Sequence, residues 1–96
     1  MAVAQFAFMP LEGAFPSAYV AGATVEAESV SGSNAVTAAA ATAVQNVCRV
    51  VSDTACYVSF GAAPDASTDS VRFYMPANAV EYFRVKSGDK AAVVAA

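Results

Sequence analysis

The sequence predicts a small all-β protein, an antiparallel β-sandwich or barrel for which a jelly-roll-like topology is one candidate. Three observations predict this class. Short runs in which Val, Tyr, Phe and Cys alternate with polar residues recur along the chain, most clearly between residues 44 and 85. Turn-forming residues separate these runs every 8–12 residues or so, which is about the spacing in sandwiches and barrels. The bulky apolar residues are 15 Val, six Phe and four Tyr against one Leu and no Ile, and this set favours strands over helices.

The first sixteen residues form an apolar segment that differs from the rest of the chain. Glu12 is its only charged residue, and Pro10 and Pro16 interrupt any long regular element. Two interpretations are open: a first edge strand that packs its aromatic side chains into the protein's own core, or an extended arm that lies on a neighbouring subunit. We adopt an arm over residues 1–16 and a single β domain over residues 17–96. The predicted interface side chains of the arm are its large apolar ones: Phe6, Phe8, Met9, Leu11 and Phe15.

The next two segments differ in how clearly they predict structure. Residues 24–30 alternate, with Glu26 and Glu28 on one face, and predict a strand after a turn or bulge at Gly22. Residues 31–43 are rich in Ala, Ser and Thr, and the Ala run favours a helix by propensity alone. Such a helix would have no large apolar side chains to bury, and burial supplies most of the stability of helices in proteins. We therefore expect extended or looping chain there.

The clearest local signal is a predicted hairpin with strands over residues 44–52 and 55–61. A two-residue loop between these strands would place Cys48 and Cys56 on opposite faces of the sheet. A register slip of one residue would bring them to one face but roughly 13 Å apart along the strand. Because a disulfide needs Cα atoms within about 7 Å, we expect two free thiols that serve as small buried apolar groups.

Three further strands complete the predicted set. They cover residues 70–75, 79–85 and 91–96, and a loop rich in Ser, Thr and Asp that starts at Gly61 precedes them. A charged turn leads into the last strand, and Gly88 supplies the positive φ that such a turn requires.

The composition indicates a protein that associates with copies of itself or with neighbours. The length fits one domain, and although 57% of the residues are hydrophobic, 24 residues are Ala, whose methyl group contributes little to a core. A chain with so few bulky core residues usually needs a disulfide, a metal or an oligomer. Since no staple or metal site is evident, we expect a homo-oligomer, for example a trimer.

Charge and hydropathy argue against several classes of partner. The net charge is −3 and the five basic residues are dispersed, so nucleic-acid binding through phosphate neutralisation is not expected. No apolar run approaches the roughly 20 residues that span a bilayer, so no membrane partner is expected. The first residues lack the basic leader of a secretory signal, which favours a cytoplasmic origin.

The residue chemistry argues against catalysis. The absence of His removes Ser-His and Cys-His couples and any imidazole base. Glu26 and Glu28, about 7 Å apart on one strand face, have a spacing that suits a glycosidase pair, but surface carboxylates that promote solubility explain them better. Asp65 and Asp69 match no calcium-binding loop, and a solvated turn explains them. We predict no catalytic residue, no metal and no cofactor.

Four aromatic residues lie on strands that we expect to be neighbours: Tyr57, Tyr74, Tyr82 and Phe83. Their rings could stack on sugars or bases. Aromatic residues at strand alternation more often fill a core or an interface, so a ligand platform is the weaker interpretation.

From residue 43 onward, the order of features resembles that of a known family. A strand, a turn and a second strand that ends in aromatic-Gly are followed by a Ser/Thr/Asp loop, within AVQNVCRVVSDTACYVSFGAAPDAS. A further strand leads to a P-x-x-x-V-E-Y-F stretch, a charged Gly turn and a final apolar run, in MPANAVEYFRV and AAVVAA. This order is similar to that of the auxiliary head proteins (decoration or cement proteins) of tailed bacteriophages, which are encoded near the major capsid gene. The likeness covers a little over half of the chain.

The resemblance implies a non-enzymatic β-protein that binds the major capsid protein and stabilises a phage capsid by bridging neighbouring subunits of the shell. It also implies a place in the virion, reached by assembly in the host cytoplasm. A second hypothesis comes from another functional class: a receptor- or carbohydrate-binding module of a phage tail or fibre, which would use the aromatic strand faces.

Overall fold

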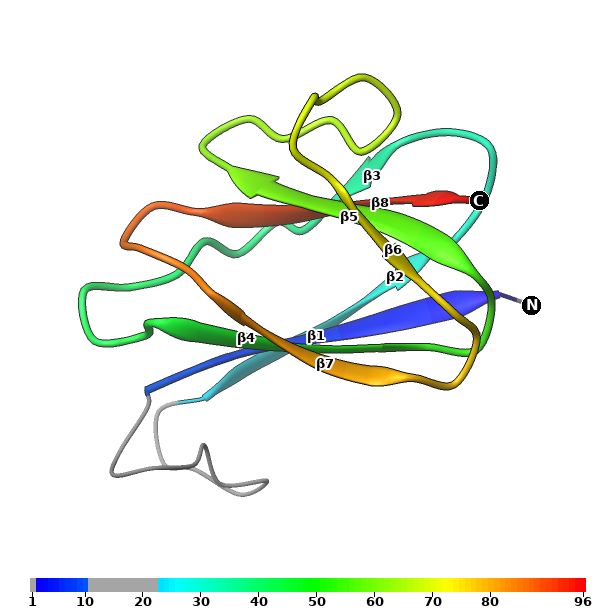
Figure 1. Cartoon of the computed structure of the whole chain (residues 1–96). Helices are drawn as coiled ribbons and strands as arrows, with labels where there is room; N and C mark the ends of the chain where they lie inside the picture. Colours follow the sequence, from blue (N-terminus) through cyan, green and yellow to red (C-terminus); the bar gives the residue numbers. More distant parts are fainter. Residues whose placement is uncertain (1, 11–22) are drawn as a thin grey trace.

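Two antiparallel β-sheets pack face to face in this protein (Figure 1). The computed structural model describes residues 2–10 and 23–96. All regular elements in these two ranges are strands, so the prediction of a small all-β sandwich is confirmed. The strands are β1 (Val3–Met9), β2 (Thr24–Ser29), β3 (Ala35–Val36), β4 (Val47–Ser52), β5 (Cys56–Gly61), β6 (Phe73–Met75), β7 (Val80–Arg84) and β8 (Lys90–Ala95).

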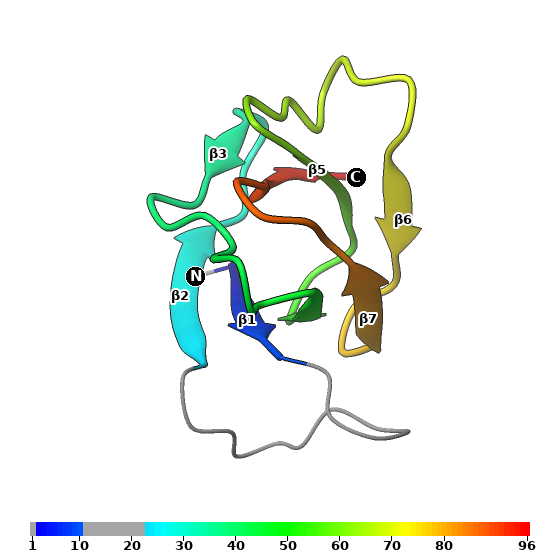
Figure 2. The ribbon, with the colours of Figure 1, turned by 90° about the vertical axis from the view of Figure 1, so that its left-hand side faces the viewer.

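Each sheet contains four strands. Sheet A has the order β2-β1-β4-β7 and sheet B the order β3-β8-β5-β6. The chain changes sheet at every connection except β1 to β2 and β5 to β6. If β1 is counted after β8, this series of crossings is that of an eight-stranded jelly roll. In Figure 2, β2 and β3 lie at one edge of the sandwich, while β6 and β7 lie at the opposite edge.

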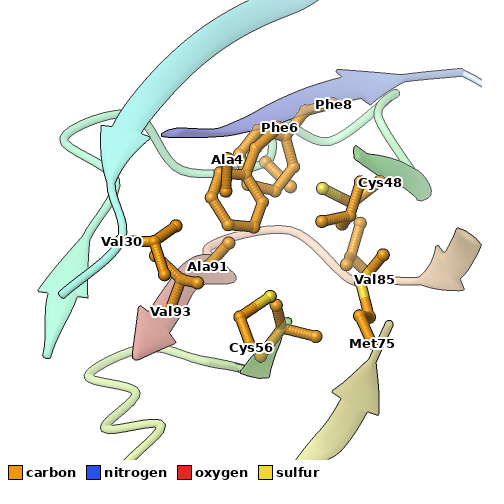
Figure 3. Close-up of a cluster of buried hydrophobic side chains, with 13 residues drawn as sticks. Ala4, Phe6, Phe8, Val30, Cys48, Cys56, Met75, Val85, Ala91 and Val93 are labelled. Atoms are coloured by element: carbon orange, nitrogen blue, oxygen red, sulfur yellow. The ribbon is translucent and has the colours of Figure 1, made fainter. Parts of the chain in front are cut away.

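The main core lies between the sheets and is built from alternate strand residues. Phe6 and Phe8 of β1 are fully buried there and are its largest side chains. Cys48 of sheet A and Cys56 of sheet B point into the same cluster (Figure 3). Both thiols are free and buried, which confirms the sequence-based prediction.

The structure overturns the arm interpretation for Val3–Met9. This segment is β1, an inner strand that pairs with β2 on one side and with β4 on the other. Phe6 and Phe8 are fully buried and Met9 is 2% exposed, so none of the three is available to a neighbouring subunit. The physical reason is that a core with so few bulky residues requires these two rings. The remaining predicted interface residues, Leu11 and Phe15, lie outside the described residues.

The predicted hairpin over residues 44–61 is also wrong. Strand β4 pairs with β1 and β7, whereas β5 pairs with β8 and β6 in the other sheet. The turn between them therefore carries the chain across the sandwich. Asp53 fixes this turn, because its carboxylate accepts the N–H of Val3 at 2.9 Å and its own N–H bonds to the Val3 carbonyl at 3.2 Å. A short turn between two alternating strands does not reveal whether the strands share a sheet.

Residues 31–43 are extended and looping, as predicted. Their one regular element is β3, which pairs with β8. Thr37 is buried and ties the following chain to β8, since its N–H bonds to the Ala91 carbonyl at 2.8 Å and its hydroxyl accepts the Ala91 N–H at 3.1 Å. In the last turn, Gly88 adopts a φ of 91°, which also agrees with the prediction.

Candidate functional site

No group of three or more His, Cys, Asp or Glu side chains is arranged to hold a metal ion within residues 2–10 and 23–96. In the same part of the chain, the structure has no helix of the length and hydropathy that would cross a membrane. The carboxylate groups and the exposed apolar surface are the candidates for a functional site.

Glu26 and Glu28 lie on the inward side of β2, the edge strand of sheet A. The Glu26 carboxylate accepts the N–H of Ala38 at 2.7 Å and the N–H of Ala39 at 3.1 Å, and so ties β2 to the chain that follows β3. We call β2, β3 and residues 37–41 the polar edge. The sequence placed Glu26 and Glu28 correctly on one strand face, and Glu26 joins the two sheets along this edge.

The two carboxyl groups of this pair influence each other. A hydrogen bond with Glu26, together with partial desolvation and the neighbouring charge, raises the pKa of Glu28 to about 7. The same hydrogen bond lowers the pKa of Glu26, and the bonds from Ala38 and Ala39 and the charge of Lys90 act in the same direction. One shared proton is therefore favoured at mildly acidic pH, with the charge residing on Glu26.

Asp65 and Asp69 fasten the loop over residues 62–72 onto the outer face of sheet B. The Asp69 carboxylate accepts the Ser59 hydroxyl and the Asp65 N–H, and hydrogen bonds from Ser67 lower the pKa of Asp65. Ala66 of this loop is fully buried against β8. Both carboxylates thus hold a turn, and the loop covers the outer face of sheet B at Ala92 and Val94 of β8.

The opposite edge of the sandwich, formed by β6 and β7, exposes large apolar side chains. Five of the eight exposed large hydrophobic residues in the described part of the chain fall between residues 71 and 82. We call these five residues the aromatic edge: Val71, Phe73, Tyr74, Val80 and Tyr82. Tyr74 and Tyr82 expose 55% and 50% of their surface, and Phe73 exposes 44%.

Aromatic rings close the gap between the sheets at this edge. The Phe83 ring of β7 lies 5.1 Å from the Phe60 ring of β5 and 5.0 Å from the Phe73 ring of β6, measured between centroids. Edge-to-face and tilted ring pairs at such distances are favourable. The edge is therefore closed by side-chain packing, and its outermost members remain in contact with solvent.

The four aromatic residues that the sequence suggested as a ligand platform do not share one face. Tyr57 and Tyr74 form a T-shaped pair at 5.7 Å on the outer side of sheet B, where the Arg72 guanidinium lies 4.2 Å from the Tyr57 ring centre. Tyr82 lies on the outer side of sheet A, and Phe83 lies between the sheets. Only Tyr74 and Tyr82 of this group belong to the aromatic edge.

The arrangement is suited to binding another macromolecule. Tyr, Phe and Arg are the residue types that are enriched at protein interfaces, and large exposed apolar patches mark sites of association. Strands β6 and β7 are also the last strands of their sheets among the described elements, and edge strands can accept a further strand. Sequence reasoning did not single out Val71, Phe73 or Val80. The signal that could have found them is the presence of apolar residues on both faces of the 70–85 segment, since only one face of each sheet packs in a two-layer sandwich.

Comparison of the chain with models of known protein families, with curated proteins and with solved structures finds no match in any of the three.

Proposed function

We propose that this protein is a non-enzymatic structural component of a tailed-bacteriophage virion, which binds the major capsid protein and stabilises the shell by bridging neighbouring subunits. The observation that carries the proposal is the aromatic edge, where four large apolar side chains on the edge strands β6 and β7, and Val71 just before β6, stand in solvent. A soluble protein rarely keeps such a surface uncovered unless it docks there. The docking site is thus on the folded sandwich, at the edge opposite the polar edge.

The stretch that carries the family resemblance builds part of this edge. Residues 76–83 form the turn into β7 and most of that strand. Asn78 has a φ of 66° in this turn and donates its N–H to the Ser52 carbonyl at 2.7 Å, which anchors the turn to sheet A. The turn thereby sets the start of β7, on which Val80 and Tyr82 are exposed.

Weak contacts suffice for a protein that acts in many copies on a symmetric shell. Apolar surface contributes about 25 cal/mol per Å² on burial, so one small edge supplies modest affinity. The same contact is repeated at every equivalent position of a symmetric shell. Bridging then stabilises the shell because each copy opposes the separation of the subunits that it joins.

Co-sedimentation with empty capsids of the phage that encodes this chain tests the proposal. The double variant Val71→Thr/Tyr74→Thr removes apolar surface at exposed positions and introduces Thr, whose β-branched side chain suits extended chain. The unaltered protein should pellet with capsids and the double variant should remain in the supernatant. The matched control is Val25→Thr, which alters an exposed Val on β2 at the polar edge and should bind like the unaltered protein.

Undiminished binding of a folded double variant would refute docking through the aromatic edge. Failure of the unaltered protein to pellet with capsids would refute the proposed function itself. Circular dichroism of each variant separates loss of binding from loss of folding.

A receptor- or carbohydrate-binding module of a phage tail or fibre is the second candidate function. The exposure of Tyr74 and Tyr82 favours it, since solvent-facing Tyr rings can stack on sugar rings. Glycan-array binding by the purified protein that is lost on Tyr74→Ala or Tyr82→Ala would support this candidate against capsid binding.

A further inference from the structure

The edge of sheet A at β7 has a defined set of outward-facing main-chain groups. Val85 donates its N–H to the Asn46 carbonyl at 3.0 Å, one step beyond the β4–β7 register. Hydrogen-bonded and non-bonded pairs alternate in an antiparallel ladder, so Glu81 and Phe83 are the residues that bond to β4. The alternate residues direct their N–H and C=O groups away from β4: Val80, Tyr82 and Arg84.

These same residues carry their side chains on the outer face of sheet A. Tyr82 lies opposite Arg49 of β4, and Val80 lies opposite Val51. Val80 and Tyr82 are both exposed. Outward main-chain groups and exposed apolar side chains therefore coincide at one strand.

We propose that a second copy of this chain pairs with this edge, β7 against β7, in antiparallel register about a two-fold axis with Tyr82 opposite Tyr82 of the second copy. The two copies of sheet A then form one continuous sheet. Outward groups meet outward groups in this register, and about six main-chain hydrogen bonds connect the copies, because three opposed pairs exchange two bonds each. All five residues of β7 take part in the pairing.

The register is compatible with the charges on β7. Arg84 faces Val80 of the second copy and Glu81 faces Phe83, so no like charges stand opposite each other. The two Tyr82 side chains are cross-strand neighbours, as aromatic pairs in sheets often are. Residues 80–84 also contain neither Pro nor Lys, two residue types that protect edge strands from pairing.

The other edge strand of sheet A is more strongly protected. Two inward-facing carboxylates, Glu26 and Glu28, stand on β2, whereas β7 carries one, Glu81, and inward-pointing charges are a known device against edge-to-edge association. Pairing through β2 would bring these carboxylates of two copies near each other. The copies therefore meet at β7.

This inference rests on the proposed function and explains how one small protein bridges. Pairing through β7 leaves the β6 side of the aromatic edge uncovered in each copy, with Val71, Phe73 and Tyr74 in solvent. A two-fold dimer therefore presents two equivalent docking surfaces. Each surface engages one subunit of the shell.

Charge variants at position 82 test the register directly, with the mass of the full chain measured by sedimentation velocity. Tyr82→Lys and Tyr82→Glu each place like charges opposite each other across the two-fold axis, so each variant alone should be monomeric. An equimolar mixture of the two variants should recover the dimer mass, because opposite charges then face each other. The unaltered protein should be a dimer.

The controls are Val25→Lys and Val25→Glu, which place the same charges on β2 and should leave the dimer mass unchanged. Val80→Glu and Val80→Lys give a second test, in which the dimer dissociation constant should change by a smaller amount. The introduced carboxylate would face Arg84 of the second copy and should lower the dimer dissociation constant about fivefold, whereas Val80→Lys should raise it by a similar factor.

Several outcomes would overturn the inference. They are a monomeric or trimeric unaltered protein, a dimer that survives Tyr82→Lys, or a mixture that stays monomeric although both variants are folded. Capsid co-sedimentation separates this failure from failure of the proposed function. If the unaltered protein binds capsids as a monomer, the proposed dimer is wrong and capsid binding stands. If it forms the dimer but does not bind capsids, the proposed function is wrong and the dimer stands.

Discussion

The two edges of this sandwich are closed by different means. At the polar edge, hydrogen bonds join the sheets, because Glu26 on β2 accepts the backbone N–H groups of Ala38 and Ala39, which follow β3. At the aromatic edge, the rings of Phe60, Phe73 and Phe83 join them by packing. Hydrogen bonds satisfy the groups that make them, whereas packed rings leave their outer surfaces in water.

The two edges also differ in how much apolar surface they expose. Only Val25 and Val36 among large apolar residues are exposed on the described strands of the polar edge, while the aromatic edge exposes two Tyr, one Phe and two Val. The polar edge is complete within one chain. The aromatic edge leaves large apolar side chains in contact with solvent.

The largest expected effect concerns the ring cluster. Phe83→Ala removes the ring that contacts both Phe60 and Phe73, and we expect a loss of about 2–4 kcal/mol in the free energy of unfolding. Urea denaturation measures this change. A loss as small as that of the surface control Val25→Ala would mean that ring packing does not close this edge.

At the polar edge, Glu26→Ala should lower the free energy of unfolding by about 1–2 kcal/mol, since it leaves two backbone N–H groups without their carboxylate acceptor. Amide hydrogen exchange should accelerate at Ala38 and Ala39, but much less in β5. Glu26→Gln retains an acceptor oxygen and should show an intermediate effect. Unchanged exchange at Ala38 and Ala39 in a folded Glu26→Ala variant would show that the Glu26 carboxylate does not hold these two N–H groups.

The Glu26–Glu28 pair should make the stability of the polar edge depend on pH. The pKa of Glu28 is raised from 4.5 to about 7, so its contribution is fully present below pH 4.5 and is lost as pH rises through 7. The lowered pKa of Glu26 gives the opposite dependence at lower pH, where stability is lost as its carboxylate becomes protonated. The melting temperature should therefore decline between pH 5 and pH 8 in the unaltered protein.

Glu28→Gln isolates this effect, because the amide keeps a hydrogen-bond donor for Glu26 and carries no charge. The variant should show a flatter melting-temperature profile over this pH range. Its melting temperature should therefore rise relative to that of the unaltered protein as pH increases. Parallel profiles for the two proteins would show that Glu28 does not titrate near neutrality.

The smallest expected change in stability belongs to the exposed side chains. Val71→Thr should alter the free energy of unfolding by no more than about 0.5 kcal/mol, and Tyr74→Thr by about 0.5–1.5 kcal/mol because it also removes the ring pair with Tyr57. Thermal denaturation of each variant checks these values. A large loss of stability would show that these side chains support the fold, and their role in docking would then need other variants.

Local patterns predicted much of the secondary structure of this chain. The strand near residues 24–30, the extended Ala-rich segment and the turn at Gly88 follow from alternation, from the lack of an apolar helix face and from backbone freedom. Alternation indicates which side chains share a face. It does not indicate which strand lies next to which, so the β4–β5 hairpin was predicted where the chain changes sheet.

The same limit explains what the sequence revealed about the candidate site. Phe6 and Phe8 had the alternation of any buried strand, and only the paired neighbours β2 and β4 distinguish an inner strand from an arm. Tyr57 and Tyr74 are both aromatic residues on strands, yet the edge position of β6 makes Tyr74 the more exposed of the two. The bonds from Glu26 to Ala38 and Ala39 could not be predicted, because they join segments whose proximity depends on the whole fold.

The two buried thiols can serve as a probe for separation of the two sheets. Cys48 and Cys56 belong to opposite sheets, and burial raises both pKa values, that of Cys48 to about 12, so reactive thiolate is scarce while the sheets are packed together. A thiol-labelling reagent can modify either residue only after the layers separate. The rate of labelling therefore measures how often the two layers separate transiently.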